Sequence, residues 1–215
     1  MFRHIISQTF QGKTTNRMLM NAELRTINLN GKILDLGAGN IRSSYFSFLK
    51  TENLDSIISL DKMPDRKPDI IADLEKGLPL SNSEYDGVLC FNLLEHIYEH
   101  KELLAEIVRV LKPGGRLIGY VPFLVQFHPD PHDFYRYTEQ ALKKLFEEAG
   151  FGHSEIKFIG RGALTAAWSQ IEYILPKFLR WPVIFLVFGL DAIILKLKPV
   201  FREKYPLGYV FLAQK

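Results

Sequence analysis

The sequence predicts an α/β protein: a doubly wound, mostly parallel seven-stranded sheet with an apolar helical insertion before its last strand. Two observations predict this fold. Short apolar runs, each sufficient for one buried strand, alternate along the chain with segments of helical periodicity. The first run, 32–36, leads directly into the turn Gly37-Ala38-Gly39, and two later runs end on acids. This arrangement is typical of sheets that bind ligands at the carboxyl ends of their strands.

Composition favours one domain over 1–215. The chain is 47% hydrophobic, which allows one sizeable core. Its formal net charge of +3 is small, and its basic and acidic residues are evenly mixed along the chain, so we expect no nucleic-acid partner. The one cysteine, Cys90, excludes an intrachain disulfide and a site built from several cysteines. Residues 1–11 contain no long apolar leader, so we expect a cytoplasmic location.

Local patterns predict the elements of the first half. Met20, Leu24 and Ile27 recur at helical spacing, so we expect a helix over 16–27 within an N-terminal helical lead-in of 1–30. The elements expected next are a strand leading into the glycine turn over 32–40, a short helix over 43–49, strands over 56–61, 69–73 and 85–91, a helix over 101–111 and a strand over 116–121.

The second half begins with a capped helix. Thr138 is expected to cap its start, and Gly150 to end it. A strand over 154–159 then completes a core of 31–160. The remaining parts are an apolar helical insertion over 161–199 and a final strand over 208–213 within 205–215, expected to be antiparallel at or near the sheet edge.

Two acids at strand ends suggest a nucleoside site. Asp61 follows Gly39 by 22 residues and ends the next strand, where a carboxylate can accept both hydroxyls of a ribose. Asp73 ends the third strand and can accept a hydrogen bond from an adenine amino group, beside the apolar Leu74. Either acid alone could simply begin a loop or cap a helix.

Five motifs occur in order between about 30 and 160. They are Asp35-Leu-Gly37-Ala-Gly39; Asp61; Asp73-Leu74 before Leu78-Pro79-Leu80; Tyr85-Asp86-Gly87-Val88 to Glu95-His96; and Arg109-Val110-Leu111-Lys112-Pro113-Gly114-Gly115. In this order they resemble the class I S-adenosylmethionine-dependent methyltransferases of the type 11 group, whose fold is Rossmann-like. The segment 128–138 is similar to a subgroup found beside enzymes of polysaccharide and glycolipid biosynthesis.

The resemblance implies S-adenosylmethionine as the cofactor and assigns it a set of contacts. The methionine end would be held by Asp35 and the backbone of Gly37, Ala38 and Gly39, the ribose by Asp61 with Lys62 beside it, and the adenine by Asp73 and Leu74, while Asn92 and Leu93 line the methionine side. A third glycine often follows in such turns, but Ile41 and Arg42 stand there. Their presence argues against a dinucleotide pyrophosphate at this turn.

Candidate catalytic residues gather in 128–136. His132, His128 and Asp133 are expected to act there, because a histidine held by a carboxylate can deprotonate an acceptor hydroxyl. The alternative is that these residues pin a proline-rich loop. A metal bound by His128, Asp130 and His132 is conceivable, but we expect none, since such loops usually just turn. We interpret Tyr135, Arg136, Tyr137 and His96 as structural residues.

The insertion carries the apolar run 181–195, bounded by Lys177, Arg180, Lys196 and Lys198. Fifteen residues would fall short of a hydrocarbon core of about 30 Å, and Asp191 within it adds a cost of about 3 kcal/mol, so we expect no membrane span. Three interpretations stay open for 176–199: a lid over the acceptor site, a peripheral membrane contact with basic anchors, and a homodimer interface.

Two functions stay open. The first is methyl transfer to an unidentified small-molecule or lipid- or sugar-linked acceptor. The second is binding of S-adenosylmethionine without turnover, by a regulatory or assembly partner that has kept the fold.

Overall fold

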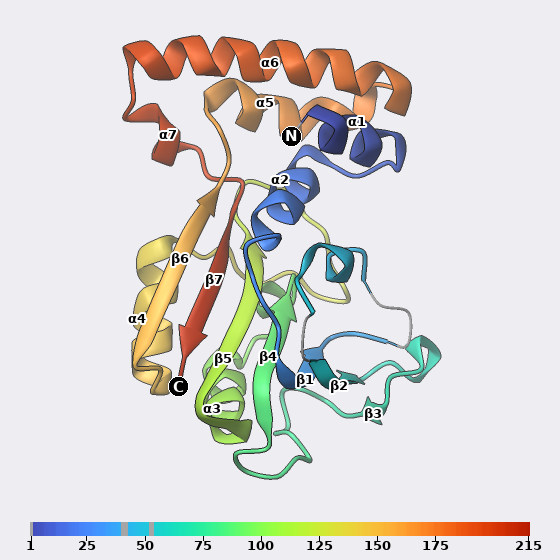
Figure 1. Ribbon diagram of the computed structural model, residues 1–215, viewed down its shortest axis with the longest axis vertical. Coiled ribbons are helices and arrows are strands. Elements are labelled where there is room, and N and C mark those ends of the chain that lie inside the picture. Colours follow the sequence, from blue (N-terminus) through green and yellow to red (C-terminus); the bar gives the residue numbers. More distant parts are fainter. Residues whose placement is uncertain (1, 40–42, 52–53) are drawn as a thin grey trace.

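The computed structural model describes residues 2–39, 43–51 and 54–215, and it contains one seven-stranded sheet in the order β3-β2-β1-β4-β5-β7-β6 (Figure 1). Parallel pairing joins β3 to β2, β2 to β1, β1 to β4 and β4 to β5, and β7 lies antiparallel between β5 and β6. The strands are β1 (Gly31–Leu36), β2 (Leu54–Asp61), β3 (Ile70–Ile71), β4 (Tyr85–Phe91), β5 (Leu111–Pro122), β6 (His153–Ile159) and β7 (Gly208–Gln214). The predicted fold class and the antiparallel last strand are confirmed.

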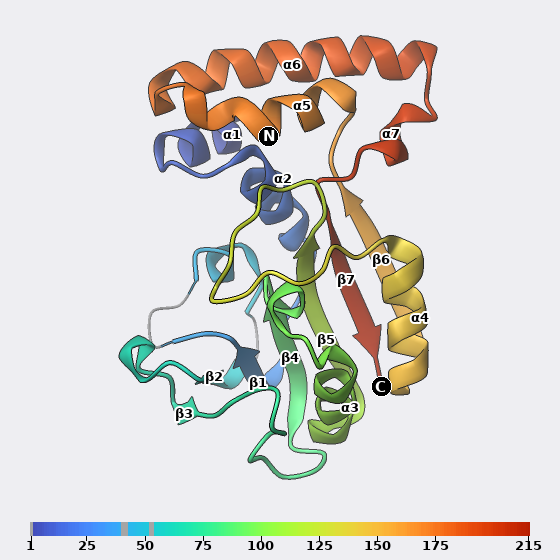
Figure 2. The same ribbon diagram turned by 180° about the vertical axis from the view of Figure 1, so that it is seen from behind.

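Helices cover both faces of the sheet, as Figures 1 and 2 show from opposite sides. One face is covered by α3 (His100–Val110) and α4 (Glu139–Ala149), whose Leu104 and Phe146 join the larger core cluster. The other is covered by α2 (Thr15–Leu24), whose Leu24 packs with Ile33 of β1. The capping predictions for α4 are confirmed, because Thr138 accepts a hydrogen bond from the Ala141 amide and Gly150 ends the helix with φ 100°.

Two predicted helices differ in the structure. The lead-in contains two helices, α1 (Phe2–Phe10) and α2, instead of one over 16–27. Gly12, with φ 77°, turns the chain between them. The expected helix over 43–49 is only the 3-10 turn η1 (Phe46–Phe48). Its serines and aromatic residues are weak helix formers, and the burial of Tyr45 and Leu49 against the sheet decides the local conformation.

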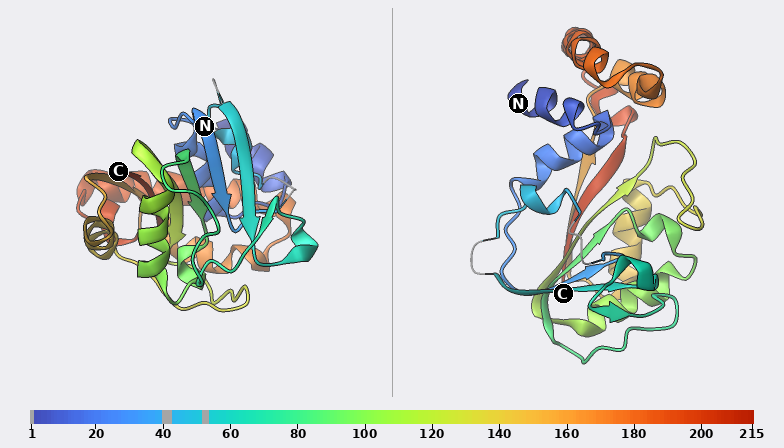
Figure 3. Two further views of the ribbon diagram at one scale, coloured as in Figure 1. Left: turned by 90° about the horizontal axis from the view of Figure 1, so that it is seen from below. Right: turned by 90° about the vertical axis from the view of Figure 1, so that its right-hand side faces the viewer.

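The insertion forms a helical layer at the carboxyl end of the sheet, seen from the side in Figure 3. We call α1, α5 (Ala163–Ile171), η4 (Glu172–Ile174) and α6 (Lys177–Leu197) the cap layer, and α7 (Phe201–Lys204) leads from it to β7. Within the layer α6 packs against both α5 and α1. The expected run of 15 residues is too short, because α6 has 21 residues and extends beyond 181–195 at both ends.

Two buried carboxylates tie the cap layer together at helix starts. Asp191 of α6 accepts hydrogen bonds from the Leu164 amide (3.1 Å), the Thr165 amide (2.8 Å) and the Thr165 hydroxyl (2.6 Å) at the start of α5. Glu172 accepts bonds from the Thr15 amide and hydroxyl at the start of α2. Free amides and the helix dipole make such starts favourable sites for an anion.

Replacing Asp191 should therefore destabilise the protein. Because hydrogen bonds to a charged group contribute about 1.5–3 kcal/mol each and do not add fully, we expect Asp191→Ala to cost about 3 kcal/mol, or about 6–12 °C in Tm. Asp191→Asn, which keeps one acceptor, should cost less. Thermal unfolding followed by circular dichroism measures both variants, with the exposed Asp55→Ala as control. Equal melting of wild type and Asp191→Ala would contradict the capping role.

Candidate cofactor and acceptor site

Parallel register brings three strand ends to one level. Leu36 of β1 pairs with Leu60 of β2 on one side and with Cys90 of β4 on the other. The Gly37 amide then donates to the Leu60 carbonyl at 2.8 Å, and its φ of 71° lies in the left-handed region that favours glycine. The residues that follow these strands therefore meet at one edge of the sheet.

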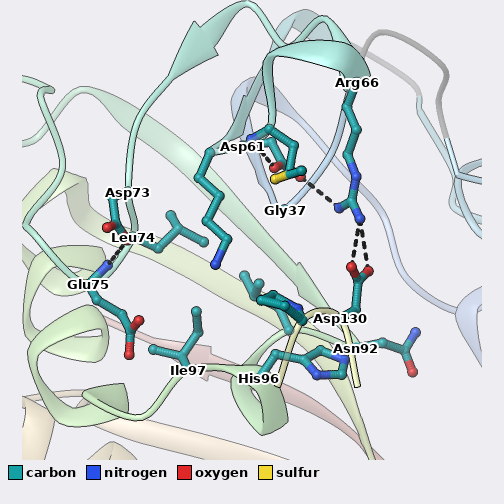
Figure 4. A pocket seen from close by; sticks show the side chains of 14 residues that line it. Gly37, Asp61, Arg66, Asp73, Leu74, Glu75, Asn92, His96, Ile97 and Asp130 are labelled. Atoms are coloured by element: carbon teal, nitrogen blue, oxygen red, sulfur yellow. Dashed lines mark hydrogen bonds and ion pairs between the residues drawn. The ribbon is translucent and has the colours of Figure 1, made fainter. Parts of the chain in front are cut away.

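A groove of about 750 Å³, including the space at its mouth, opens at this edge (Figure 4). Of the predicted cofactor residues it is lined by Gly37, Asp61, Lys62, Asp73, Leu74, Asn92 and Leu93. A second hollow, of about 1010 Å³, is lined by Ala38 and Gly39 and again by Gly37 and Asn92. The two hollows thus lie on either side of the glycine turn.

An ion pair separates the two hollows. Arg66 lines both, and its guanidinium lies 2.9 Å from an Asp61 oxygen and 2.9 Å from both Asp130 oxygens (Figure 4). Asp130 chiefly, and then Asp61, raise the pKa of Arg66. The Arg66–Asp130 pair is largely exposed, so it contributes less than about 1 kcal/mol and can open for a ligand that extends from one hollow to the other.

Asp61 keeps acceptor capacity despite these contacts. One of its oxygens accepts the Met63 amide at 2.8 Å, and the other accepts Arg66. A carboxylate offers about four lone-pair sites, so each oxygen retains one for a ligand hydroxyl. Asp73 lies across the groove with the buried Leu74 beside it. The groove therefore presents a carboxylate at each side and an apolar surface between them.

Asp35 lies beneath the glycine turn. It is 2% exposed and accepts a hydrogen bond from the Tyr45 hydroxyl at 2.7 Å, while the Tyr45 ring stacks on Phe91. Burial, followed by the charge of Asp35, raises the pKa of Tyr45 well above its ordinary value. The Asp35 carboxylate thus holds the Tyr45 side chain close to the end of β1. Ile41 and Arg42, which argued against a dinucleotide, lie outside the described residues.

The loop 128–136, here called the histidine loop, is fastened to the turn η3 (Leu94–His96) after β4. The Phe134 and Tyr135 amides donate to the Glu95 carbonyl at 2.8 and 3.3 Å. The hydroxyl of Tyr137, just beyond the loop, donates to the Leu94 carbonyl at 3.1 Å. The structural interpretation of Tyr137 is confirmed by this contact.

The candidate catalytic residues have different surroundings. His128 points toward Glu95, with Nε2 3.8 Å from a carboxylate oxygen, and Glu95 is the main cause that raises the pKa of His128. Asp133 is held by Arg136, which lowers the pKa of Asp133 far below its ordinary value. The ring of His132 is tilted against Phe134 at the surface. Their roles in catalysis remain predictions.

Two residues at the site were missed by sequence reasoning. Arg66 lies five residues after Asp61, but no local pattern indicates that its side chain folds back on that acid. Glu95 was quoted only as part of a motif, although an acid soon after a buried strand was the signal used for Asp61. His96 follows Glu95 in the chain and was interpreted as structural, but its side chain lines the groove.

Known proteins share part of this sequence. Residues 34–119 match the family model of a methyltransferase domain. A probable S-adenosylmethionine-dependent methyltransferase of Mycolicibacterium smegmatis is 29% identical over 92 residues, covering 40% of this chain and 36% of that protein. A demethylmenaquinone methyltransferase of Renibacterium salmoninarum is 34% identical over 122 residues, covering 53% and 49%. The chain spans about a third to a half of the length of these curated relatives.

Solved structures share the fold. An S-adenosylmethionine-dependent methyltransferase from Archaeoglobus fulgidus aligns over 97% of both chains, with a TM-score of 0.59 and 20% identity. Phosphoethanolamine N-methyltransferase 2 of Haemonchus contortus, solved with S-adenosyl-L-methionine, aligns over 90% of this chain and 51% of its own, with a TM-score of 0.54 and 15% identity. Residues 34–119 thus match a methyltransferase domain in sequence, and the chain as a whole shares the fold of these solved methyltransferases.

S-adenosylmethionine is the cofactor named for these relatives, and the groove at the strand ends fits it. Asp61 has acceptor sites left for two hydroxyls, and Leu74 and Ile97 offer apolar surface to a purine. A Cβ at Gly39 would lie 2.2 Å from the Arg66 carbonyl oxygen, so only glycine lets the chain pass there. These features are those of a nucleoside site with a close backbone turn beside it.

The role of Asp61 can be measured directly. We expect Asp61→Asn to bind S-adenosylhomocysteine about 10- to 100-fold more weakly, because it loses a charged acceptor worth about 1.5–3 kcal/mol. Isothermal titration calorimetry gives the affinity. Asp55→Asn, an exposed acid on the same strand and outside the groove, is the matched control and should bind like wild type. Unchanged affinity in Asp61→Asn would remove Asp61 from the site.

Proposed function

We propose that this protein transfers a methyl group from S-adenosylmethionine to a small-molecule or lipid-linked acceptor. The observation that carries the proposal is the groove at the ends of β1, β2 and β4, where Asp61 and the glycine turn face the histidine loop. The cofactor supplies a sulfonium methyl that is already activated. The chain has therefore chiefly to bind and orient the two partners and to exclude water.

The residues divide this work between two ends of the site. Asp61, Asp73 and Leu74 would hold the adenosine, and the backbone of 37–39 the methionine end. On the acceptor side, the histidine loop and η3 contribute His128 and Glu95, whose charged or polar groups lie within a few ångströms of each other. Relatives named for acceptors as different as demethylmenaquinone and phosphoethanolamine do not select an acceptor for this chain. Nothing observed favours the alternative of binding without turnover.

The surface of α6 supports a membrane as the place of action. Its inner face carries the buried apolar Ile184 and Phe188 together with Arg180 and Asp191, which are 8% and 1% exposed. Its outer face is an apolar stripe at helical spacing, which consists of Leu179, Leu186, Leu190, Ile193 and Leu197. A helix of a water-soluble protein turns a polar face outward, whereas α6 is apolar on its outer face as well as on much of its inner face. We therefore propose that this stripe lies against a lipid bilayer.

Basic residues flank the stripe at both ends. Lys177 begins α6, and Lys196 and Lys198 lie at its end, all exposed. Each basic residue near an anionic lipid surface contributes about 1 kcal/mol, which favours an anionic bilayer over a second copy of this basic helix. Within the described residues α6 is the one helix long and apolar enough to cross a membrane, with a mean hydropathy of 2.0. At about 31 Å its length permits a span, but its inner face is occupied by α5 and α1, so we propose surface contact.

The cap layer unites two interpretations of 176–199. Gln126 in the β5–α4 connection donates to the Gln170 carbonyl of α5, so the cap layer adjoins the segment that leads into the histidine loop. A lipid-linked acceptor held by α6 would thus lie at the same end of the sheet as the groove. The layer would serve both as a roof over the acceptor site and as the membrane contact.

Methyl transfer should be detectable with a mixed acceptor pool. We expect the full chain, incubated with methyl-labelled S-adenosylmethionine and a total membrane lipid extract, to yield a labelled lipid. Asp61→Asn should lower the rate at limiting cofactor about 10- to 100-fold, and Asp55→Asn should leave it unchanged. Product is measured by chromatography of the extracted lipids. The same incubation is repeated with a glycan extract and a small-molecule extract. If the protein binds the cofactor but labels none of the three extracts, the non-catalytic function is favoured.

Membrane contact should depend on the outer stripe. We expect wild-type protein to float with anionic vesicles, and the double variant Leu186→Glu, Ile193→Glu to stay in the soluble fraction, because it places two anions on the contact face. Ile71→Glu, an equally exposed apolar residue on β3, is the matched control and should still float. If wild type does not float, but forms a dimer that the double variant breaks, the stripe is a homodimer interface.

A further inference from the structure

A buried carboxylate beside the groove has no hydrogen-bond partner. Glu95 is 0% exposed, and among the residues that the structure describes neither of its carboxylate oxygens accepts a hydrogen bond. Leaving a charged group unpaired in the interior costs several kcal/mol, so such a group is usually paired or bound to a metal. The methyltransferase fold by itself gives no reason for this arrangement.

Two histidines direct the same nitrogen at this carboxylate. Nε2 of His96 and Nε2 of His128 each lie 3.8 Å from the same Glu95 oxygen. The three ligand atoms lie within 4.8 Å of one another. Two ligands bound about 2.0–2.1 Å from a tetrahedral ion lie about 3.3 Å apart. A movement of about half an ångström would bring each histidine nitrogen to that spacing from the Glu95 oxygen, and the two nitrogens, which lie within 4.8 Å of each other, would move together around the ion.

Backbone carbonyls leave both of these nitrogens free to bind. Nδ1 of His96 lies 2.5 Å from the His132 carbonyl oxygen, and Nδ1 of His128 lies 2.9 Å from the Gln126 carbonyl oxygen. Each Nδ1 must therefore carry the proton, which gives each Nε2 a lone pair in the neutral ring. Arg136 lies 3.5 Å from Nδ1 of His128, at the outer limit of a hydrogen bond. The closer Gln126 carbonyl therefore determines that Nδ1 carries the proton. Histidines that bind metals are oriented in this way.

We propose that Glu95, His96 and His128 form a binding site for one divalent transition-metal ion of the zinc type. Two imidazoles and one carboxylate are the ligand set of zinc sites that keep a further position for water or substrate. His96 lines the cofactor groove and the His128 side chain is partly exposed, so that position faces the acceptor side. The sequence predicted no metal, because loops of this composition usually just turn. Of the three ligands considered there, His128 belongs to the present cluster, whereas Asp130 and His132 do not.

An ion at this site would have a chemical use, which rests on the proposed function. It would bind a hydroxyl oxygen of the acceptor and lower the pKa of that hydroxyl, so that its proton could pass to water. The oxygen would then form its bond to the methyl carbon as the sulfonium S–C bond breaks, which leaves the cofactor as S-adenosylhomocysteine. His128 would then act as a ligand. The site itself requires neither the cofactor nor the acceptor, and it can be tested without them.

The test is a titration of the tag-free, chelator-treated full chain with ZnCl₂ and no cofactor. We expect calorimetry to give one zinc per chain, and His128→Ala and Glu95→Gln each to weaken binding more than about 100-fold, since partners behind the ligands alone change metal affinity 10- to 100-fold. His132→Ala is the matched control, because this neighbouring histidine supplies only its backbone carbonyl, and it should bind zinc like wild type.

A second readout does not depend on heat of binding. Zinc should raise the Tm of wild type and of His132→Ala, and should leave that of His128→Ala unchanged. Absence of one-to-one binding, or equal affinity in wild type and His128→Ala, would overturn the proposal. Cofactor titration of the metal-free protein separates the two proposals: loss of cofactor binding there counts against the methyltransferase function, and the zinc result stands independently.

Discussion

The site depends on the parallel register of β1 with β2 and β4. Because Leu36 pairs with Leu60 and Cys90, the residues after each strand meet at one edge of the sheet. Gly37 then turns away in a conformation that favours glycine, and the space it leaves becomes the groove. A slip of one residue in the β1–β2 pairing would move Asp61 to the opposite face of the sheet and separate it from the turn. The cofactor site is thus a consequence of strand pairing, before any side chain makes contact with a ligand.

The cap layer is apolar on its outer surface as well as in its core, where Ile184 and Phe188 pack with Trp168. Asp191 and Glu172 are buried at the starts of α5 and α2, where free amides satisfy them, and leucines of α6 face outward. An apolar outer surface is favourable when it meets lipid. Asp191 thus joins α6 to α5 and Glu172 joins η4 to α2, while the outer face of α6 stays exposed for an apolar partner.

Glu95 links the two ends of the proposed active site. Its backbone carbonyl fastens the histidine loop to the end of β4, and its side chain lies where two histidines converge. Across the groove, Arg66 joins Asp61 to Asp130. Asp130 belongs to the histidine loop, which also carries His128. The cofactor groove and the proposed metal site are therefore adjacent parts of one surface, and both include residues that follow β4.

The sequence by itself determined the strands, the glycine turn, the cap of α4 and the acids at strand ends. These features depend on periodicity and on hydrogen bonds between near neighbours, which a linear pattern records. It missed α1 and mistook 43–49 for a helix, because there packing against the sheet outweighs weak local preference. Only the tertiary structure decided that Asp191 caps α5, that Arg66 spans the groove and that Glu95, His96 and His128 converge. Glu95 and His128 are separated by a helix and a strand, so their meeting depends on the path of a loop, which no local pattern contains.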